Sequence, residues 1–102
     1  MILEDAHGNY IDRKAYEAAY ASMVANGVVR HAQVRDEVAQ KVVVTLMRHR
    51  AAYGTSALAS AATASEVADQ VRSLLGDAYL TVPVAEIADA AMAAGRALSE
   101  AS

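Results

Sequence analysis

The chain has 102 residues, a formal net charge of −3 and no cysteine. This length is typical of one domain, which we expect to span 1–102. The absence of cysteine excludes disulfide frameworks, thiolate metal sites and thiol catalysis. No apolar run reaches the ~20 residues of a membrane span, and MILEDAHGNY lacks the basic and apolar regions of a signal peptide. We therefore expect no membrane partner and a cytoplasmic location, or a place in an intracellularly assembled particle.

The composition limits the kind of core that the chain can form. Hydrophobic residues make up 55% of the chain, but Phe and Trp are absent. The core must therefore be built from Val, Leu, Ile, Met, Tyr and many alanines. Small side chains let helices approach closely, yet each buries little apolar surface. Since burial stabilises the fold by ~25 cal/mol per Å² of apolar surface, each contributes little. Small cores of this kind often depend on oligomerisation or on a partner.

Residues 1–11 have a pattern unlike the rest of the chain. Two short apolar segments, Met1–Leu3 and Tyr10–Ile11, flank a polar turn that contains Gly8-Asn9. This pattern predicts either a short β-hairpin or an extended arm. Because an isolated hairpin is only marginally stable, such an element must pack on other helices or pair with another chain.

The first helix is expected over residues 12–26. Asp12 is a suitable N-cap, and Asn26-Gly27 is a typical helix end. Helical spacing places on one apolar face Tyr16, Ala19, Tyr20 and Met23. A short connector follows, so the next helix should return alongside the first as a helical hairpin.

The longest helical pattern covers residues 30–53. One face carries Val34, Val38, Val42, Leu46 and Tyr53, with Thr45 and His49 on the same side. The segment from Val42 to Met47 is apolar on nearly all sides, and alone it would also suit a buried strand. Because the helical period runs for more than ~20 residues, we predict a central helix, ended by Gly54.

This central helix also carries most of the basic residues of the chain. Arg30, Arg35, Lys41, Arg48 and Arg50 lie within it, while the segments on either side are acidic. Basic residues near a helix C-terminus are favoured by the helix dipole. The same residues are candidate contacts for nucleic-acid phosphates.

The stretch 56–75 has two interpretations. Its first part, rich in Ala, Ser and Thr, is either a helix capped by Thr55 or Ser56 or a flexible linker. Ser65 is a second suitable N-cap, so the pattern also allows two helices broken near 64, and Gly76 ends the segment. A last helix is predicted over 83–99, with Pro83 in its first turn. The fold class is therefore all-α, a bundle of four to five helices.

No residue pattern typical of an enzyme is present. The histidines, His7, His31 and His49, lack the spacing of a metal site. The chain has neither a Gly-x-Ser-x-Gly elbow nor a phosphate-binding Gly-Lys-Ser/Thr sequence. We therefore predict a protein that is not an enzyme, with no catalytic residues, no metal site and no cofactor.

The apolar residues outside the helical pattern are the candidate interface. They are Ile2, Leu3, Tyr10, Ile11 and Tyr79. If exposed together, they form an apolar patch suited to a protein partner. The sequence thus favours a small helical protein–protein interaction module: an assembly subunit, adaptor or inhibitor, of the kind that mobile elements encode, which self-associates or docks on a larger assembly. The alternative is a nucleic-acid-binding regulator that uses the basic helix over 30–53.

Overall fold

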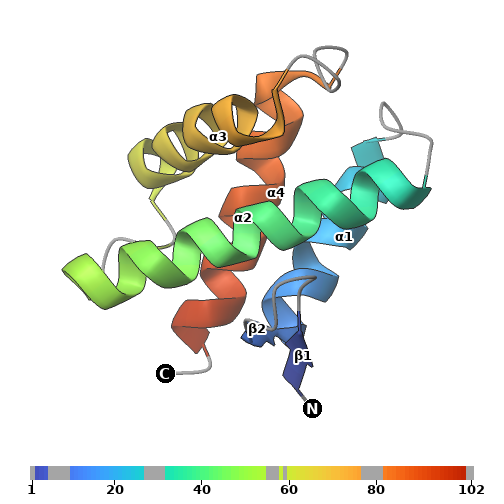
Figure 1. Ribbon diagram of the computed structural model, residues 1–102. Helices are drawn as coiled ribbons and strands as arrows, with labels where there is room; N and C mark the ends of the chain where they lie inside the picture. The colour runs from blue at the N-terminus through green and yellow to red at the C-terminus, as the bar shows by residue number, and fades with distance from the viewer. Residues whose placement is uncertain are drawn as a thin grey trace.

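A computed structural model describes residues 2–4, 10–26, 32–54, 58, 60–76 and 82–100. In chain order its elements are β1 (Ile2–Glu4), β2 (Tyr10–Asp12), α1 (Arg13–Asn26), α2 (Ala32–Tyr53), α3 (Ala61–Leu75) and α4 (Val84–Glu100). The predicted all-α bundle is confirmed, because these four helices pack together with a small hairpin beside them (Figure 1).

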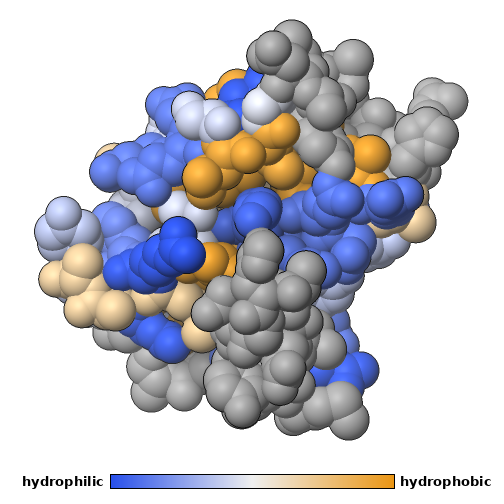
Figure 2. All heavy atoms as spheres, viewed as in Figure 1, coloured by the Kyte–Doolittle hydropathy of each residue, from blue (hydrophilic) through white to orange (hydrophobic). Residues whose placement is uncertain are grey.

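Helix α4 is the element that the other helices surround. It packs most extensively on α1 and then on α3, and it also contacts α2. Figure 1 shows α2 lying across one side of the bundle, where it crosses α4. On the same side, hydrophilic residues follow α2 and hydrophobic residues gather between α2 and α3 (Figure 2). No helix in the described part of the chain is long and apolar enough to cross a membrane.

The two strands form an antiparallel hairpin, the first of the two alternatives for the N-terminal segment. Ile2 pairs with Asp12, Leu3 with Ile11, and Glu4 with Tyr10. Ile11 is only 1% exposed and belongs to the core. The expectation that Ile11 contributes to an exposed patch is therefore wrong, because its side chain holds β2 against the helices instead.

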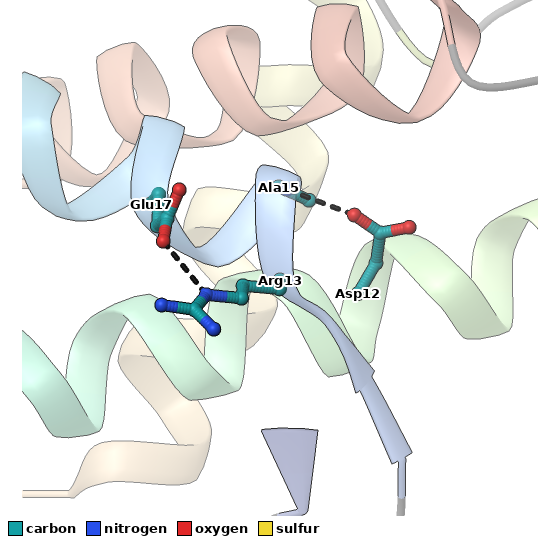
Figure 3. Close-up of polar contacts among 4 residues, drawn as sticks. All are labelled: Asp12, Arg13, Ala15 and Glu17. Carbon is teal, nitrogen blue, oxygen red and sulfur yellow. Dashed lines mark hydrogen bonds and ion pairs between the residues drawn. The ribbon is translucent and has the colours of Figure 1, made fainter. Parts of the chain in front are cut away.

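Asp12 ends β2 and starts α1, as predicted. The backbone N–H of Ala15 donates a hydrogen bond of 3.0 Å to its Oδ1, which satisfies one of the free donors at the helix start (Figure 3). Arg13, the first residue of α1, donates from Nε to Oε1 of Glu17 one turn later, at 2.9 Å. This exposed i,i+4 pair adds only ~0.3–0.5 kcal/mol to helix stability.

The core is formed by small and medium side chains from every helix and from the hairpin. Its larger members are Ile11, Met23, Val38, Val42, Val43, Leu46, Leu58, Val67, Val71, Ile87 and Leu98. Alanines of α1 and α4 complete it, among them Ala15, Ala19, Ala90, Ala91 and Ala94. As predicted, α2 is buried on several sides around Val42 and Val43.

Three large apolar residues at helix ends are exposed, among them Tyr53, which was expected on the apolar face of its helix. Tyr53 is 73%, Leu74 57% and Val84 37% accessible to solvent. All three occupy the first or last turn of their helices. Helical periodicity indicates the side of the helix on which a residue lies. It does not indicate how far along the helix axis the neighbouring helices extend. At these three positions no part of the described core covers the helix end.

Helix α3 begins between the two starting points that the sequence offers. Ser60 is its N-cap, with the Thr63 N–H donating to Ser60 Oγ at 3.1 Å. The predicted cap at Ser65 and the break near residue 64 are wrong, because the helix passes through Ser65 without interruption. Alanine has the highest helix propensity and favours this continuity. Thr55 and Ser56 lie outside the described residues.

The helix ends otherwise follow their predicted chemistry. Gly54 ends α2 with φ 84°, and its N–H donates to the Arg50 carbonyl at 2.8 Å. Gly76 ends α3 with φ 71° and ψ −165°. The Pro83 carbonyl accepts the first backbone hydrogen bonds of α4, from Glu86 and Ile87.

One side chain joins the end of α3 to the start of α4. Arg72 Nη1 donates to the backbone carbonyl of Val82 at 2.7 Å. Val82 is buried, so a charge-assisted hydrogen bond and apolar packing together fix the chain directly before α4.

We predict that Gly76→Ala lowers the free energy of unfolding by about 1–3 kcal/mol. The φ and ψ of Gly76 lie in a region that is essentially restricted to glycine. Apart from its chain neighbours, no atom of the described residues lies within 4 Å of an added Cβ, so the cost is conformational rather than steric. Gly76→Asn should be equally costly. Urea denaturation measures both variants, and a loss below about 0.5 kcal/mol for either would contradict the assignment.

A second prediction concerns the buried threonines. Thr45 Oγ1 has no hydrogen-bond partner within the described structure, whereas Thr63 Oγ1 accepts from Ser60 at 2.9 Å. Because a buried hydroxyl without a partner is destabilising, Thr45→Val should raise the free energy of unfolding by about 1 kcal/mol. Thr63→Val is the matched control and should lower it. An equal decrease in the free energy of unfolding of both variants would show that the Thr45 hydroxyl does form a hydrogen bond.

Candidate interaction surface

A pair of tyrosines on α1 forms the centre of the candidate site. Tyr16 and Tyr20 lie one turn apart, half-buried, and both pack against the core. Their ring centroids are 6.0 Å apart and the ring planes are tilted by 39°. This separation and tilt are favourable for two aromatic rings. The sequence predicted both residues at the core or its rim, and this is where they lie.

Polar contacts with α2 hold this pair in place. The Tyr16 hydroxyl donates a hydrogen bond to Asp36 Oδ1. The other oxygen of the same carboxylate accepts from Gln40 Nε2 at 2.9 Å. Asp36 is therefore fixed by a residue of its own helix and by a tyrosine of α1, so it sets how α1 is oriented against α2.

Arg35 reinforces the same contact between α1 and α2. Its guanidinium carbon lies 5.3 Å from the centroid of the Tyr20 ring, within the range of a cation–π interaction. Arg35 was predicted as a phosphate contact. It is instead half-buried against α1, and a phosphate ligand would have to compete with the tyrosine for its charge.

Burial raises the pKa of the Tyr16 hydroxyl well above its ordinary value. The hydrogen bond to Asp36, the negative charge of that carboxylate and the nearby Tyr20 act in the same direction. A phenolate in this position would lose its donated hydrogen bond and face a carboxylate. The α1–α2 contact therefore depends on a protonated Tyr16.

The outer side of α1 beside the tyrosines is open and hollowed. Ala15, Ala19 and Met23 face the core. At about 100° per residue, Glu17, Ala21 and Val24 lie on the opposite side of the helix. An open hollow of about 210 Å³ is lined by Tyr16, Glu17, Tyr20 and Ala21. Val24 continues this surface and is 52% exposed.

The shape of the hollow follows from the order of residues along α1. Side chains four residues apart form ridges on a helix surface, and the space between two ridges is a groove. Here one ridge contains Tyr16, Tyr20 and Val24, and the next contains Glu17 and Ala21. Because Ala21 is small, the groove deepens beside Tyr20. We call the surface formed by Tyr16, Glu17, Tyr20, Ala21 and Val24 the α1 groove.

The structure does not bring the predicted apolar interface together as one described patch. Ile2, Leu3 and Tyr10 lie in the two strands, but their side chains are not among those described. Tyr79 lies outside the described residues. Ile11 is buried.

The predicted basic residues do not form one stripe along α2. Lys41 and Arg48 are seven residues apart and share a side of the helix, while Arg50 lies about 180° from Lys41. Arg35 contacts Tyr20, and Arg30 lies outside the described residues. Lys41, Arg48 and Arg50 form no ion pair with a carboxylate of the described residues.

The α1 groove was not predicted from the sequence. Glu17, Ala21 and Val24 lie off the apolar face that periodicity identifies, so a pattern search assigns them to solvent. Asp36 was not among the candidate residues. Its spacing from Gln40 indicates a contact on one helix, but nothing in the sequence pairs it with Tyr16, which lies twenty residues earlier.

The described side chains include no group of three or more His, Cys, Asp or Glu arranged to hold a metal ion. No family model, curated protein or solved structure matches the chain. The functional proposals therefore rest on the residues of this chain alone.

The raised pKa of Tyr16 predicts a loss of stability at alkaline pH. The folded state keeps Tyr16 protonated, whereas an unfolded tyrosine ionises near pH ~10. The contribution of Tyr16 is therefore fully present below about pH 10 and is lost as pH rises toward the higher folded pKa. Over this range the ionisation of Tyr16 lowers the free energy of unfolding by at most about 1.4 kcal/mol per pH unit.

Urea denaturation between about pH 9 and 11.5 tests this prediction, over the range set by tyrosine ionisation. Tyr16→Phe should be less stable than wild type at neutral pH and should lose less stability on alkalinisation. Tyr53→Phe, at the most exposed tyrosine described, is the matched control. Parallel stability curves for wild type and Tyr16→Phe would contradict the assignment.

Proposed function

We propose that this protein is a non-catalytic protein–protein interaction module, acting as an assembly subunit, adaptor or inhibitor. The observation that carries the proposal is the α1 groove, which combines half-buried aromatic rings, an exposed valine and a small residue at one open helix face. Tyrosine is enriched at protein interfaces because a large, rigid ring contributes much contact area with little loss of conformational entropy.

The groove best suits an α-helix of the partner. A ridge of side chains on one helix packs into a groove between two i,i+4 ridges of another. An amphipathic helix with apolar residues at i, i+3, i+4 and i+7 presents such a ridge. The apolar side chains would cover Tyr20, Ala21 and Val24, while Arg13 and Glu17 remain at the rim, where polar groups are usual.

Preorganisation supports the same proposal. Association is weakened when side chains lose freedom on binding. Tyr16 is already held by Asp36 and Tyr20 by Arg35. A partner that docks on the groove would therefore order few additional side chains on this protein.

The N-terminal hairpin remains a second part of the proposed interface. Ile2, Leu3, Tyr10 and Tyr79 are kept as candidate contacts from the sequence, without Ile11, which is buried. The proposed partner is either a second copy of the chain or a larger assembly. The proposed location is the cytoplasm or an intracellularly assembled particle, in keeping with the absence of cysteine.

The alternative, a nucleic-acid-binding regulator that uses the whole basic helix, is less well supported. Arg35 is engaged by Tyr20, and Lys41 and Arg50 lie on opposite sides of α2, so the helix as a whole presents no continuous row of basic side chains.

Site-specific photo-crosslinking tests the proposed function. A photoreactive residue at Ala21, in the groove, should crosslink either to a second copy or to one partner in cells of the native host. The same residue at the exposed Ala62 of α3 is the matched control and should not. Ala21→Glu should abolish the complex in size-exclusion chromatography with light scattering, while Ala62→Glu leaves it intact.

Circular dichroism must show that the variants keep the helical content of the wild-type protein. A monomer that forms no crosslink from Ala21, or the same products from Ala21 and Ala62, would disprove a specific interface on α1.

A further inference from the structure

The last turn of α2 extends beyond the bundle. Leu46 is buried, and Tyr53 lies seven residues later on nearly the same side of the helix. Tyr53 is nevertheless the most exposed of the large apolar residues described, and residues 51–54 are all exposed. In Figure 1 this end of α2 projects past α4. An inward-facing stripe therefore ends in an aromatic side chain that the described core does not cover.

Tyr53 is held in place by a second ring. Its ring centroid lies 4.8 Å from that of His49, with the planes tilted by 47°. His49 is one turn earlier on the same side of α2 and is half-buried. The contact restricts the rotation of the tyrosine side chain and leaves most of its surface open to solvent.

Two arginines lie on either side of this ring pair. Arg48 and Arg50 are the neighbours of His49 in sequence, so they project about 100° to each side of it. The sequence of α2 contains no acidic residue after Glu37. Neither arginine forms an ion pair or a side-chain hydrogen bond with a described residue. The helix dipole favours cations here, but it gives no reason for an exposed aromatic ring between them.

We propose that the C-terminal end of α2 binds single-stranded nucleic acid, with one base stacked on Tyr53 and flanking phosphates on Arg48 and Arg50. Positive charge beside an open aromatic ring is the combination used for unpaired strands, since every base has a face that can stack. An acidic peptide would satisfy the arginines, but its carboxylates offer no flat group to stack on the ring of Tyr53. A duplex keeps its bases stacked inside and cannot use Tyr53.

This proposal is independent of the α1 groove, which lies on another helix. With a net charge of −3, the protein as a whole does not attract nucleic acid over long distances. Binding should therefore be confined to this end of α2 and should be weak. Two phosphate contacts predict a slope of log affinity against log salt of about −1.4 for a single strand.

Fluorescence anisotropy with a labelled oligothymidylate of about 12 nucleotides tests the proposal at about 50 mM salt and above. We expect Tyr53→Ala to weaken binding about tenfold, because the stacking contact is removed. Tyr53→Phe should bind like wild type. Arg48→Gln and Arg50→Gln should each make the salt slope shallower by about 0.7. Arg96→Gln, at an exposed arginine of α4, is the matched control and should change neither quantity.

Four results would each overturn the proposal. The first is no binding at low salt. The second is equal affinity of wild type and Tyr53→Ala. The third is competition by poly-glutamate as effective as that by unlabelled oligothymidylate, which would identify a purely electrostatic surface suited to an acidic protein partner. A duplex of the same length that binds more tightly than the single strand would also contradict it. None of these results bears on the crosslinking experiment at Ala21.

Discussion

Close approach of α1 and α4 is the constraint on which the rest of the fold depends. The chain has no Phe or Trp to fill space between helices. Buried alanines on both helices allow them to pack directly against each other, and this contact is the most extensive in the bundle. Packing at this density leaves little room for larger side chains. Helices α2 and α3 then cover the remaining sides of α4, and Ile11 brings the hairpin into the same core.

Local chemistry made much of this fold predictable. Asp12 caps α1, and glycines end α2 and α3, because capping depends on a residue and its immediate neighbours. The start of α3 was not predicted, because Ser60, which caps the helix, is chemically equivalent to Ser56 and Ser65 and only the fold selects among them. The exposure of Tyr53 and Leu74 was not predictable for a different reason. It depends on how far neighbouring helices extend, which periodicity along one helix does not contain.

The candidate surfaces were less predictable than the fold. The contacts of Tyr16 with Asp36 and of Arg35 with Tyr20 join residues of different helices, and they depend on how α1 is rotated against α2. The sequence places Tyr16 and Tyr20 on an apolar helix face and gives Arg35 as a candidate phosphate contact, but it does not pair these residues with each other or with Asp36. At the end of α2 the sequence was more informative, because His49, Arg48, Arg50 and Tyr53 are close along one helix and their relative directions follow from its geometry.

The hydrogen bond from Arg72 to the Val82 carbonyl has a consequence for how this chain can vary. It joins the last turns of α3 to the residue directly before Pro83, so the start of α4 is held by a contact that does not run through the residues in between. Entropy of loop closure grows only slowly with loop length. Insertions directly after Gly76 should therefore be tolerated during evolution, and an epitope or a fluorescent reporter can be introduced there with little effect on the packing of α4.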